Sequence, residues 1–277
     1  MTRGVSQTAL LVAGLRADVT AEGRGLCDDP WAGALAGEDG REVARRALAV
    51  NPPLRLWLEV RTWWFDRMVR RLLPEAPQLV VLGAGLDSRA VRLAGEGVAA
   101  FEVDAPATQA EKRRRVAAVA GYPDDAVVYV ATDFEHEGDI SARLLDAGFD
   151  PERPAVVVWE GVTYYLDDAS IAATLRDLSS GLHPRSTILF DHVEARLVAG
   201  ETSGATDAPT LDLVADLGEP FRWGSNHVVP LLAGHGYRHV LEMSFDEAAL
   251  AATGTYDRDR AFRFQHLVAA SVERELW

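Results

Sequence analysis

Short apolar runs and longer amphipathic segments alternate along most of the chain. From residue 78 onward, each apolar run is followed by a segment with helical spacing, for example 140–147 and 168–182. This alternation predicts β-α-β units, and therefore a doubly wound, mostly parallel sheet with helices on both faces. The last two strand patterns are expected to form an antiparallel hairpin at one sheet edge. The seven predicted strands are 79–82, 98–103, 127–130, 155–159, 187–191, 237–245 and 263–272.

The N-terminal part of the chain has a purely helical pattern. Apolar positions recur at helical spacing in 6–19 and 54–73, and Asp29-Pro30-Trp31 is typical of a helix start. We therefore expect a helical cap over residues 1–74 and an α/β domain over residues 75–277. Within that domain, residues 195–226 have weak periodicity and many Gly, Pro, Ser and Thr, which predicts a lid insertion that faces the substrate.

A glycine-containing turn after the first predicted strand indicates a ligand site. Gly83 and Gly85 let the backbone pass close to a ligand, and the helix that follows offers free N–H groups. Asp104 ends the next predicted strand, where nucleotide-binding folds place an acid for ribose hydroxyls. The pair predicts a cofactor that contains adenosine.

The residues after the two glycines favour a cofactor without phosphates. A dinucleotide fingerprint needs a third glycine, but position 88 is serine. Asp87 also places a negative charge where phosphates would lie. S-adenosyl-L-methionine suits this loop better than a dinucleotide, although the dinucleotide remains an alternative.

Composition narrows the class of protein further. The chain has 277 residues, one cysteine (Cys27) and a formal net charge of −14, which argues against a nucleic-acid substrate. Its apolar runs are too short to cross a bilayer and no secretory signal is visible, so we expect a cytoplasmic protein without a membrane partner. The basic run 112–115 is expected to be a solvated helix face.

Four motifs occur in order along the chain: 83–89 (GAGLDSR), 102–104 (EVD), 133–134 (DF) and 160–166 (EGVTYYL). Together with Asp29-Pro30-Trp31 and Arg61-Thr62, they resemble the leucine carboxyl methyltransferase family, and in particular its bacterial branch of polyketide O-methyltransferases similar to the tetracenomycin carboxyl methylase. The resemblance covers about residues 5–245 and implies a class I methyltransferase-like Rossmann fold.

By position, the resemblance implies a set of contacts with the methyl donor. Arg61 would pair with the methionine carboxylate, a contact that suits a guanidinium group. Asp104 would accept hydrogen bonds from the ribose, and Glu160 would hold the amino group or neighbouring backbone. Asp133, with Phe134 beside it, would meet the adenine edge. The other implied donor contacts are Arg16, Gly83, Ala84, Gly85 and Asp87.

Structural roles are the alternatives for these residues: a surface ion pair for Arg61, a helix cap for Asp87 and core packing for Tyr165. Two residues are candidates for catalysis. Tyr165 is placed near the methyl group by the family pattern, and His192 follows the fifth predicted strand, at the edge where ligands gather. No metal site is expected, because the histidines are scattered along the chain.

These patterns predict an S-adenosylmethionine-dependent O-methyltransferase that releases S-adenosyl-L-homocysteine and forms a methyl ester on a small natural-product carboxylate, which needs no general base. Arg196 or Arg222 would have to position such an anion. The alternatives are a hydroxyl acceptor with His192 as base, a peptide or protein C-terminus, a nicotinamide-dependent reductase and a non-catalytic donor-binding module. We expect a monomer or homodimer.

Overall fold

The core of the protein is a seven-stranded sheet with the strand order β3-β2-β1-β4-β5-β7-β6. The computed structural model describes residues 6–23, 25–133, 139–255 and 261–276. Pairs β3-β2, β2-β1, β1-β4 and β4-β5 are parallel, whereas β7 runs antiparallel to both β5 and β6. The predicted doubly wound, mostly parallel sheet is thus confirmed. The strands are β1 (Gln78–Leu82), β2 (Ala99–Asp104), β3 (Val127–Ala131), β4 (Val156–Trp159), β5 (Thr187–Val193), β6 (His239–Ser244) and β7 (Gln265–Ser271).

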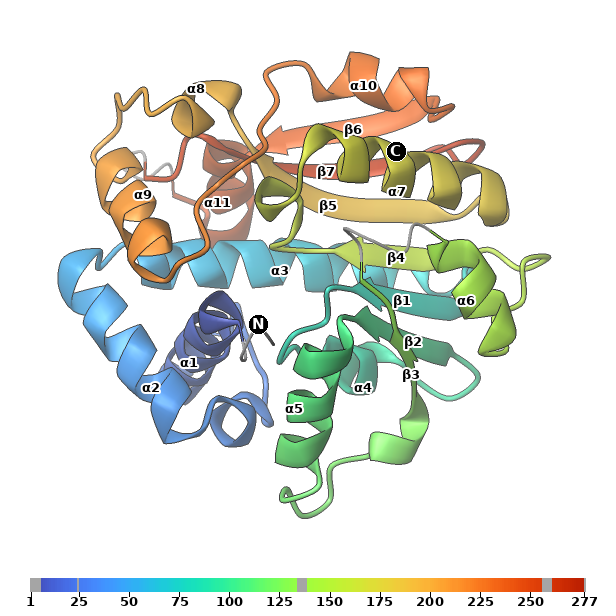
Figure 1. The fold of residues 1–277 in the computed structure, drawn as a ribbon, viewed down its shortest axis with the longest axis horizontal. Helices are drawn as coiled ribbons and strands as arrows, with labels where there is room; N and C mark the ends of the chain where they lie inside the picture. The colour runs from blue at the N-terminus through green and yellow to red at the C-terminus, as the bar shows by residue number, and fades with distance from the viewer. Residues whose placement is uncertain (1–5, 24, 134–138, 256–260, 277) are drawn as a thin grey trace.

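Both faces of the sheet are covered by helices (Figure 1). Successive strand residues alternate between two hydrophobic clusters: Leu79 and Val81 belong to one, Val80 and Leu82 to the other. This double burial explains why the strands read as continuous apolar runs. The helices are α1 (Gln7–Glu22), α2 (Ala32–Val50), α3 (Leu54–Leu72), α4 (Arg89–Leu93), α5 (Pro106–Val116), α6 (Ile140–Asp146), α7 (Asp168–Gly181), α8 (Ala195–Val198), α9 (Asp207–Asp216), α10 (Val228–Gly234) and α11 (Phe245–Thr253), with short 3₁₀ turns η1 (Asp124–Ala126) and η2 (Thr163–Tyr165).

The N-terminal helices begin where the capping residues predict. The Ser6 hydroxyl accepts a hydrogen bond from the backbone N–H of Ala9 at the start of α1. Asp29 accepts from the N–H groups of Trp31 and Ala32 at 3.0 and 3.1 Å, so its carboxylate caps the first turn of α2. Figure 1 shows α1, α2 and α9 together on one side of the molecule, with α3 crossing behind the sheet.

The predicted hairpin between β6 and β7 is wrong in its connection. The two strands do pair antiparallel, for example Val240 with Ala270, but helix α11 lies between them in the chain. Ser244 and Glu247 form a capping box that starts this helix, and its buried Phe245 belongs to the same hydrophobic cluster as the buried residues of α3. The buried face of α11 explains why the chain leaves the sheet before it returns as β7.

The prediction for the basic run is correct for Arg113 and Arg114, which are exposed, and wrong for Lys112 and for Arg115, whose side chain is 10% exposed. Lys112 is 1% exposed, and its ammonium lies 2.6 Å from the carboxylate of Glu102 on β2. A buried carboxylate needs such a partner, because an unpaired charge in the interior is costly. Burial raises the pKa of Glu102, and Lys112 opposes that effect.

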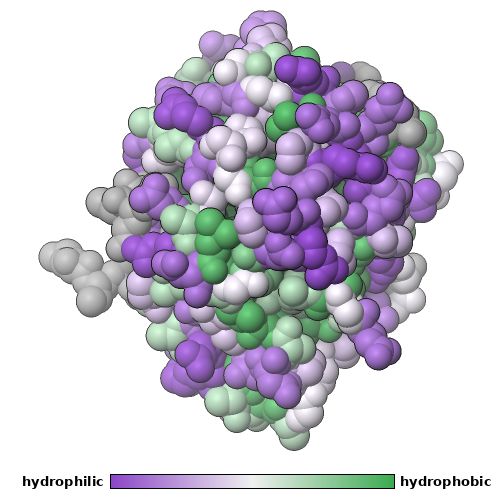
Figure 2. Space-filling model, turned by 90° about the vertical axis from the view of Figure 1, so that its right-hand side faces the viewer, coloured by the Kyte–Doolittle hydropathy of each residue, from purple (hydrophilic) through white to green (hydrophobic). Residues whose placement is uncertain are grey.

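On the face drawn in Figure 2, hydrophobic residues lie in small groups between hydrophilic ones. Within the described ranges, no helix is long and apolar enough to cross a membrane.

Candidate functional site

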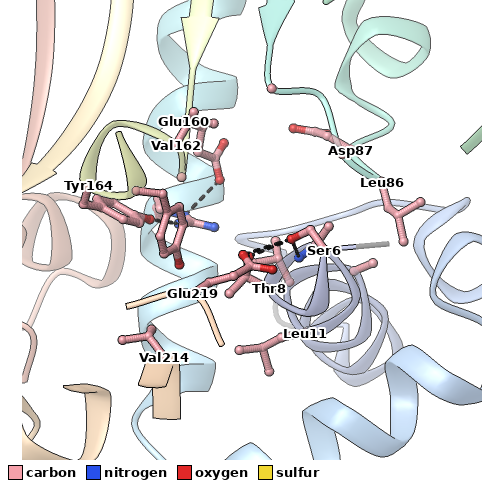
Figure 3. A pocket seen from close by; sticks show the side chains of 18 of the residues that line it. Ser6, Thr8, Leu11, Leu86, Asp87, Glu160, Val162, Tyr164, Val214 and Glu219 are labelled. Carbon is pink, nitrogen blue, oxygen red and sulfur yellow. Dashed lines mark hydrogen bonds and ion pairs between the residues drawn. The ribbon is translucent and has the colours of Figure 1, made fainter. Parts of the chain in front are cut away.

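A cavity of about 300 Å³ opens at the carboxyl ends of β1 and β4, between α1, α3 and the segment around α9. Figure 3 shows its lining side chains, which come from segments far apart in the sequence. In α/β folds with this topology, ligands bind at the carboxyl ends of the strands. The cavity brings together most of the residues that the sequence predicted for the site: Arg16, Arg61, Gly83, Ala84, Gly85, Asp87, Asp104, Glu160 and Tyr165.

The turn after β1 needs its two glycines. Gly83 and Gly85 have φ values of +63° and +50°, which side-chain-bearing residues rarely adopt. A Cβ at Gly83 would also overlap Cγ2 of Val162, a neighbouring residue of the cavity wall (Figure 3). The backbone of this loop therefore forms the wall itself, and a ligand can approach its peptide groups.

Asp104 is held in place by the same loop. Its Oδ2 accepts from the N–H of Gly85 at 2.5 Å, and its Oδ1 accepts from the N–H of Ala105 at 2.7 Å. Burial raises the pKa of Asp104, against the effect of these hydrogen bonds. The carboxylate is thus oriented at the cavity wall and can accept further hydrogen bonds from a ligand.

Next to the glycine loop, buried guanidinium and carboxylate groups alternate. Glu160 Oε1 lies 2.9 Å from Arg61 Nε and 3.7 Å from Arg16, and Glu160 Oε2 lies 2.6 Å from Arg89. Asp87 lies 3.3 Å from Arg16 and also pairs with Arg89. Such an arrangement is complementary to a zwitterion, because it offers cations to a carboxylate and carboxylates to an ammonium group.

The charges of these groups are fixed by their neighbours. Burial acts to lower the pKa of Arg16, but Asp87 and Glu160 outweigh it and the pKa is raised. Burial acts in the opposite direction on Asp87, yet Arg16 and Arg89 lower its pKa overall. Arg61 behaves like Arg16, with Glu160 as the main group that raises its pKa. Arg16, Arg61 and Asp87 therefore stay ionised at neutral pH.

Arg61 is positioned by a side chain of its own helix and by side chains from two other parts of the chain. Its guanidinium lies 3.9 Å from the centre of the Trp57 ring, and Nη1 donates to the hydroxyl of Tyr164 at 3.2 Å. Nη1 is also 3.5 Å from Asp191 on β5. Asp191 is in turn held by the N–H of Gly161 and by the Gln265 amide, each at 2.7 Å. The sequence did not predict Asp191 as a site residue, because its position at the end of the predicted strand 187–191 was the only feature that indicated it.

Tyr165 lies in an aromatic group at the other side of the cavity. Its ring packs against Tyr164 and Phe221, with centroids 4.8 and 5.8 Å apart. Burial raises the pKa of Tyr165, so its hydroxyl stays protonated at neutral pH. The hydroxyl can therefore donate a hydrogen bond, but it is a poor proton acceptor for catalysis.

Glu219 is a site residue that the sequence did not reveal. It follows α9, and its carboxylate accepts from the Ser6 hydroxyl at 3.1 Å and the Gln7 N–H at 3.0 Å, and from the hydroxyl of Thr8 (Figure 3). The negative charge lies at the N-terminus of α1, where the helix dipole favours it. This contact joins the segment around α9, which lines the cavity with Thr210, Leu213, Val214 and Phe221, to the opposite wall.

Four of the predicted residues are not among the described residues that line the cavity. His192 follows Asp191 on β5, so its side chain points to the opposite face of the sheet, where it is 1% exposed and contacts Glu242. Among the described residues that line the cavity, neither His192 nor Asp133 occurs, and Phe134 lies outside the described residues. Arg196 and Arg222 do not line the described cavity either, and Arg196 pairs with Glu194 and Asp207.

Comparisons with known proteins agree on one family. Residues 9–179 match the family described as leucine carboxyl methyltransferase. A protein of Mycolicibacterium smegmatis is 32% identical over 212 residues, which are 72% of this chain and 70% of that protein. A Mycobacterium avium protein is 31% identical over 261 residues, which are 86% of this chain and 84% of the relative. Both carry the provisional name S-adenosyl-L-methionine-dependent methyltransferase.

Solved structures show the same fold at low sequence identity. A DUF574 family protein from Streptomyces avermitilis superimposes with a TM-score of 0.64 at 16% identity, over 94% of this chain and 96% of that chain. A provisionally named methyltransferase from Thermobifida fusca gives a TM-score of 0.63 at 16% identity, over 94% of this chain and 93% of that chain.

Proposed function

Because the chain belongs to the leucine carboxyl methyltransferase family and is an S-adenosylmethionine-dependent methyltransferase, we propose that it methylates a carboxylate oxygen of a small, largely apolar natural-product acceptor. The observation that carries the proposal is the cavity itself. One end has charged groups in alternation, and the other end is lined mainly by aromatic and aliphatic side chains, with the carboxylate of Glu219 among them.

The residues present fit the methyl donor. Arg61 and Arg16 would face its methionine carboxylate, and Glu160 would face its ammonium group, while the pairs Arg61–Glu160 and Arg16–Asp87 keep these side chains in place. Asp104 would accept hydrogen bonds from the ribose hydroxyls. When bound, the donor supplies an electrophilic sulfonium methyl group.

The chain's own part in the transfer is to position the acceptor and exclude water. The apolar side chains Leu11, Val214 and Phe221 would surround an acceptor and leave little room for solvent. In-line displacement gains most from such a near-attack arrangement. An ionised carboxylate oxygen would form the new C–O bond while the C–S bond of the donor breaks and the electrons of that bond stay on sulfur, so no residue of the chain would have to remove a proton.

A carboxylate acceptor also agrees with the placement of the two candidate catalytic residues. His192 lies on the opposite sheet face, and Tyr165 is kept protonated by burial, so neither is placed to deprotonate an alcohol or phenol. A carboxylate is already ionised at neutral pH and needs no base. Tyr165 would instead donate a hydrogen bond near the reacting oxygen.

Two measurements test the proposal. Calorimetry with S-adenosyl-L-methionine and S-adenosyl-L-homocysteine should give saturable binding of both. Mass spectrometry of reactions with a panel of aromatic and aliphatic carboxylic acids, and matched phenols, should show the gain of one methyl group on acids only. The product should revert to the acid in mild base, as esters do and ethers do not. Methylation of phenols alone would refute the carboxylate assignment and leave the methyltransferase assignment intact.

A further inference from the structure

Three side chains that can bind a metal meet on the sheet face opposite the cavity. They come from three adjacent strands: His192 from β5, His266 from β7 and Glu242 from β6. His192 and His266 are direct cross-strand partners in the β5–β7 pairing. One ligand atom from each residue lies within 4.8 Å of the other two. The sequence indicated no metal site because these residues are far apart in the chain, and only strand pairing brings them together.

The hydrogen bond from Nδ1 of His192 to the backbone leaves its other ring nitrogen, Nε2, as the one that faces Glu242. Nδ1 lies 3.2 Å from the carbonyl oxygen of Val193, which can only accept, so Nδ1 carries the N–H. In the neutral ring, Nε2 then presents a lone pair, and it faces Glu242 Oε1 at 3.3 Å. Two lone pairs that face one another need a proton or a metal ion between them. A histidine whose other N–H is held by a backbone carbonyl is also the usual arrangement in metal sites.

His266 directs a second nitrogen to the same place. Its Nδ1 lies 3.1 Å from Glu242 Oε1, the oxygen that also faces His192. Its Nε2 is 3.7 Å from Glu194, whose other oxygen pairs with Arg196. One carboxylate oxygen thus lies between two imidazoles, and a single divalent ion can satisfy all three groups.

We propose that His192, Glu242 and His266 form a binding site for Zn²⁺ that ties together the ends of β5, β7 and β6. Two imidazole nitrogens and one carboxylate oxygen are a ligand set that zinc takes, with a fourth position left for water. The side chains of Glu242 and His266 are 30% and 22% exposed, so an ion can enter from solvent. The two rings are stacked at 10° to one another, so the more exposed His266 would have to rotate its ring for both lone pairs to reach one ion.

The site is independent of the proposed methyl transfer, but it is connected to the cavity through the strands. Asp191 and Gln265 are the chain neighbours of His192 and His266, and their side chains point to the opposite face of the sheet. There the Gln265 amide donates to the carboxylate of Asp191, and that carboxylate pairs with Arg61. A metal ion at the site would therefore stabilise the strand ends that support the donor-binding residues, without contact with the donor.

The test is metal binding by the full chain after removal of metal with a chelator. Calorimetry with ZnCl₂ in the presence of excess Mg²⁺ should give one Zn²⁺ per chain, and CoCl₂ should give the visible absorption bands of four-coordinate Co²⁺. His266→Gln and Glu242→Gln should each weaken Zn²⁺ binding at least about tenfold, as expected for the loss of a ligand. His239→Gln, on the same strand as Glu242 but outside the cluster, should bind Zn²⁺ like the wild type.

Circular dichroism and S-adenosyl-L-homocysteine binding of each variant establish that it is folded. Folded variants that bind Zn²⁺ as tightly as the wild type would overturn the site. A wild-type chain that binds no Zn²⁺ in this titration would do the same, and would show that the three side chains share protons instead. Neither result would affect the methyltransferase assignment, which is read from the donor titration.

Discussion

The guanidinium of Arg61 and the carboxylate of Glu160 meet in the wall of the cavity, with Nε 2.9 Å from Oε1. The first residue comes from the middle of α3 and the second from the end of β4, so the contact joins the N-terminal helices to the sheet. Both side chains are almost fully buried, at 2% and 5% exposure. The position of the donor-binding charges therefore depends on the packing of the helices on the sheet.

Arg61→Lys should bind the donor about tenfold or more weakly than the wild type. Lysine keeps the positive charge but lacks the planar fork that contacts Glu160, Asp191 and a ligand carboxylate together. Calorimetry with S-adenosyl-L-homocysteine measures the change. Arg70→Lys is the matched control, because Arg70 lies on the same helix and is 62% exposed. Equal affinity of Arg61→Lys and the wild type would refute the carboxylate contact.

Gly83→Ala should lower both stability and donor affinity. The new Cβ would be strained at φ +63° and would overlap Val162, so we expect a loss of about 1–3 kcal/mol in the free energy of unfolding. Urea unfolding and donor calorimetry measure the two effects. Gly95→Ala is the control, because Gly95 is exposed and a Cβ there meets nothing within 4 Å. A Gly83→Ala variant as stable as Gly95→Ala would contradict the strained turn.

Glu219→Ala should raise the KM for the acceptor several-fold and leave the Kd of the donor nearly unchanged. The substitution removes the hydrogen bonds that join the segment after α9 to Ser6 and Gln7 at the start of α1. We expect a loss of about 1–3 kcal/mol in stability from the unpaired donors. Steady-state kinetics with an acid that the wild type methylates, together with donor calorimetry, separate the effects, with the exposed Asp216→Ala as control. A change in the donor Kd without a change in the acceptor KM would contradict the assignment of Glu219 to the acceptor part of the cavity.

Asp66→Asn should destabilise the protein at neutral pH but hardly at low pH. Asp66 accepts from Arg89 Nε and Arg92 Nη1, each at 2.8 Å, and these cations lower its pKa below 3.8 although burial alone would raise it. The stabilisation is therefore present above pH 3.8 and is lost as the pH falls through the folded-state value.

Urea unfolding of wild type and Asp66→Asn, at pH 7 and at a pH below the folded-state pKa of Asp66 found by titrating the wild type, tests this prediction. At pH 7 we expect a difference of about 3 kcal/mol, which is typical of a broken buried pair. Asp28→Asn, a change at an exposed carboxylate, should show little difference at either pH. A difference for Asp66→Asn that is the same at both pH values would mean that its charge has no role.

The local chemistry of this protein is determined by its sequence. The alternation of apolar runs and helical segments predicts the sheet, and the GAGLDSR motif with Asp104 predicts the turn and the acid beside it, because these features depend on residues close together in the chain. The same reasoning failed for the connection through α11 and for Lys112, since both depend on which buried partner each segment meets.

Only the tertiary structure decided which charges and aromatic groups meet. Arg61 lies near Asp191, Glu219 reaches the start of α1, and His192 turns to the opposite face to meet His266, although long stretches of chain separate each pair. The physical reason is that a buried charge must find a partner, and the packing of helices and the pairing of strands determine which partners are within reach. The spacing of residues in the sequence predicts the turn and the strands, whereas the shape of the cavity depends on the whole fold.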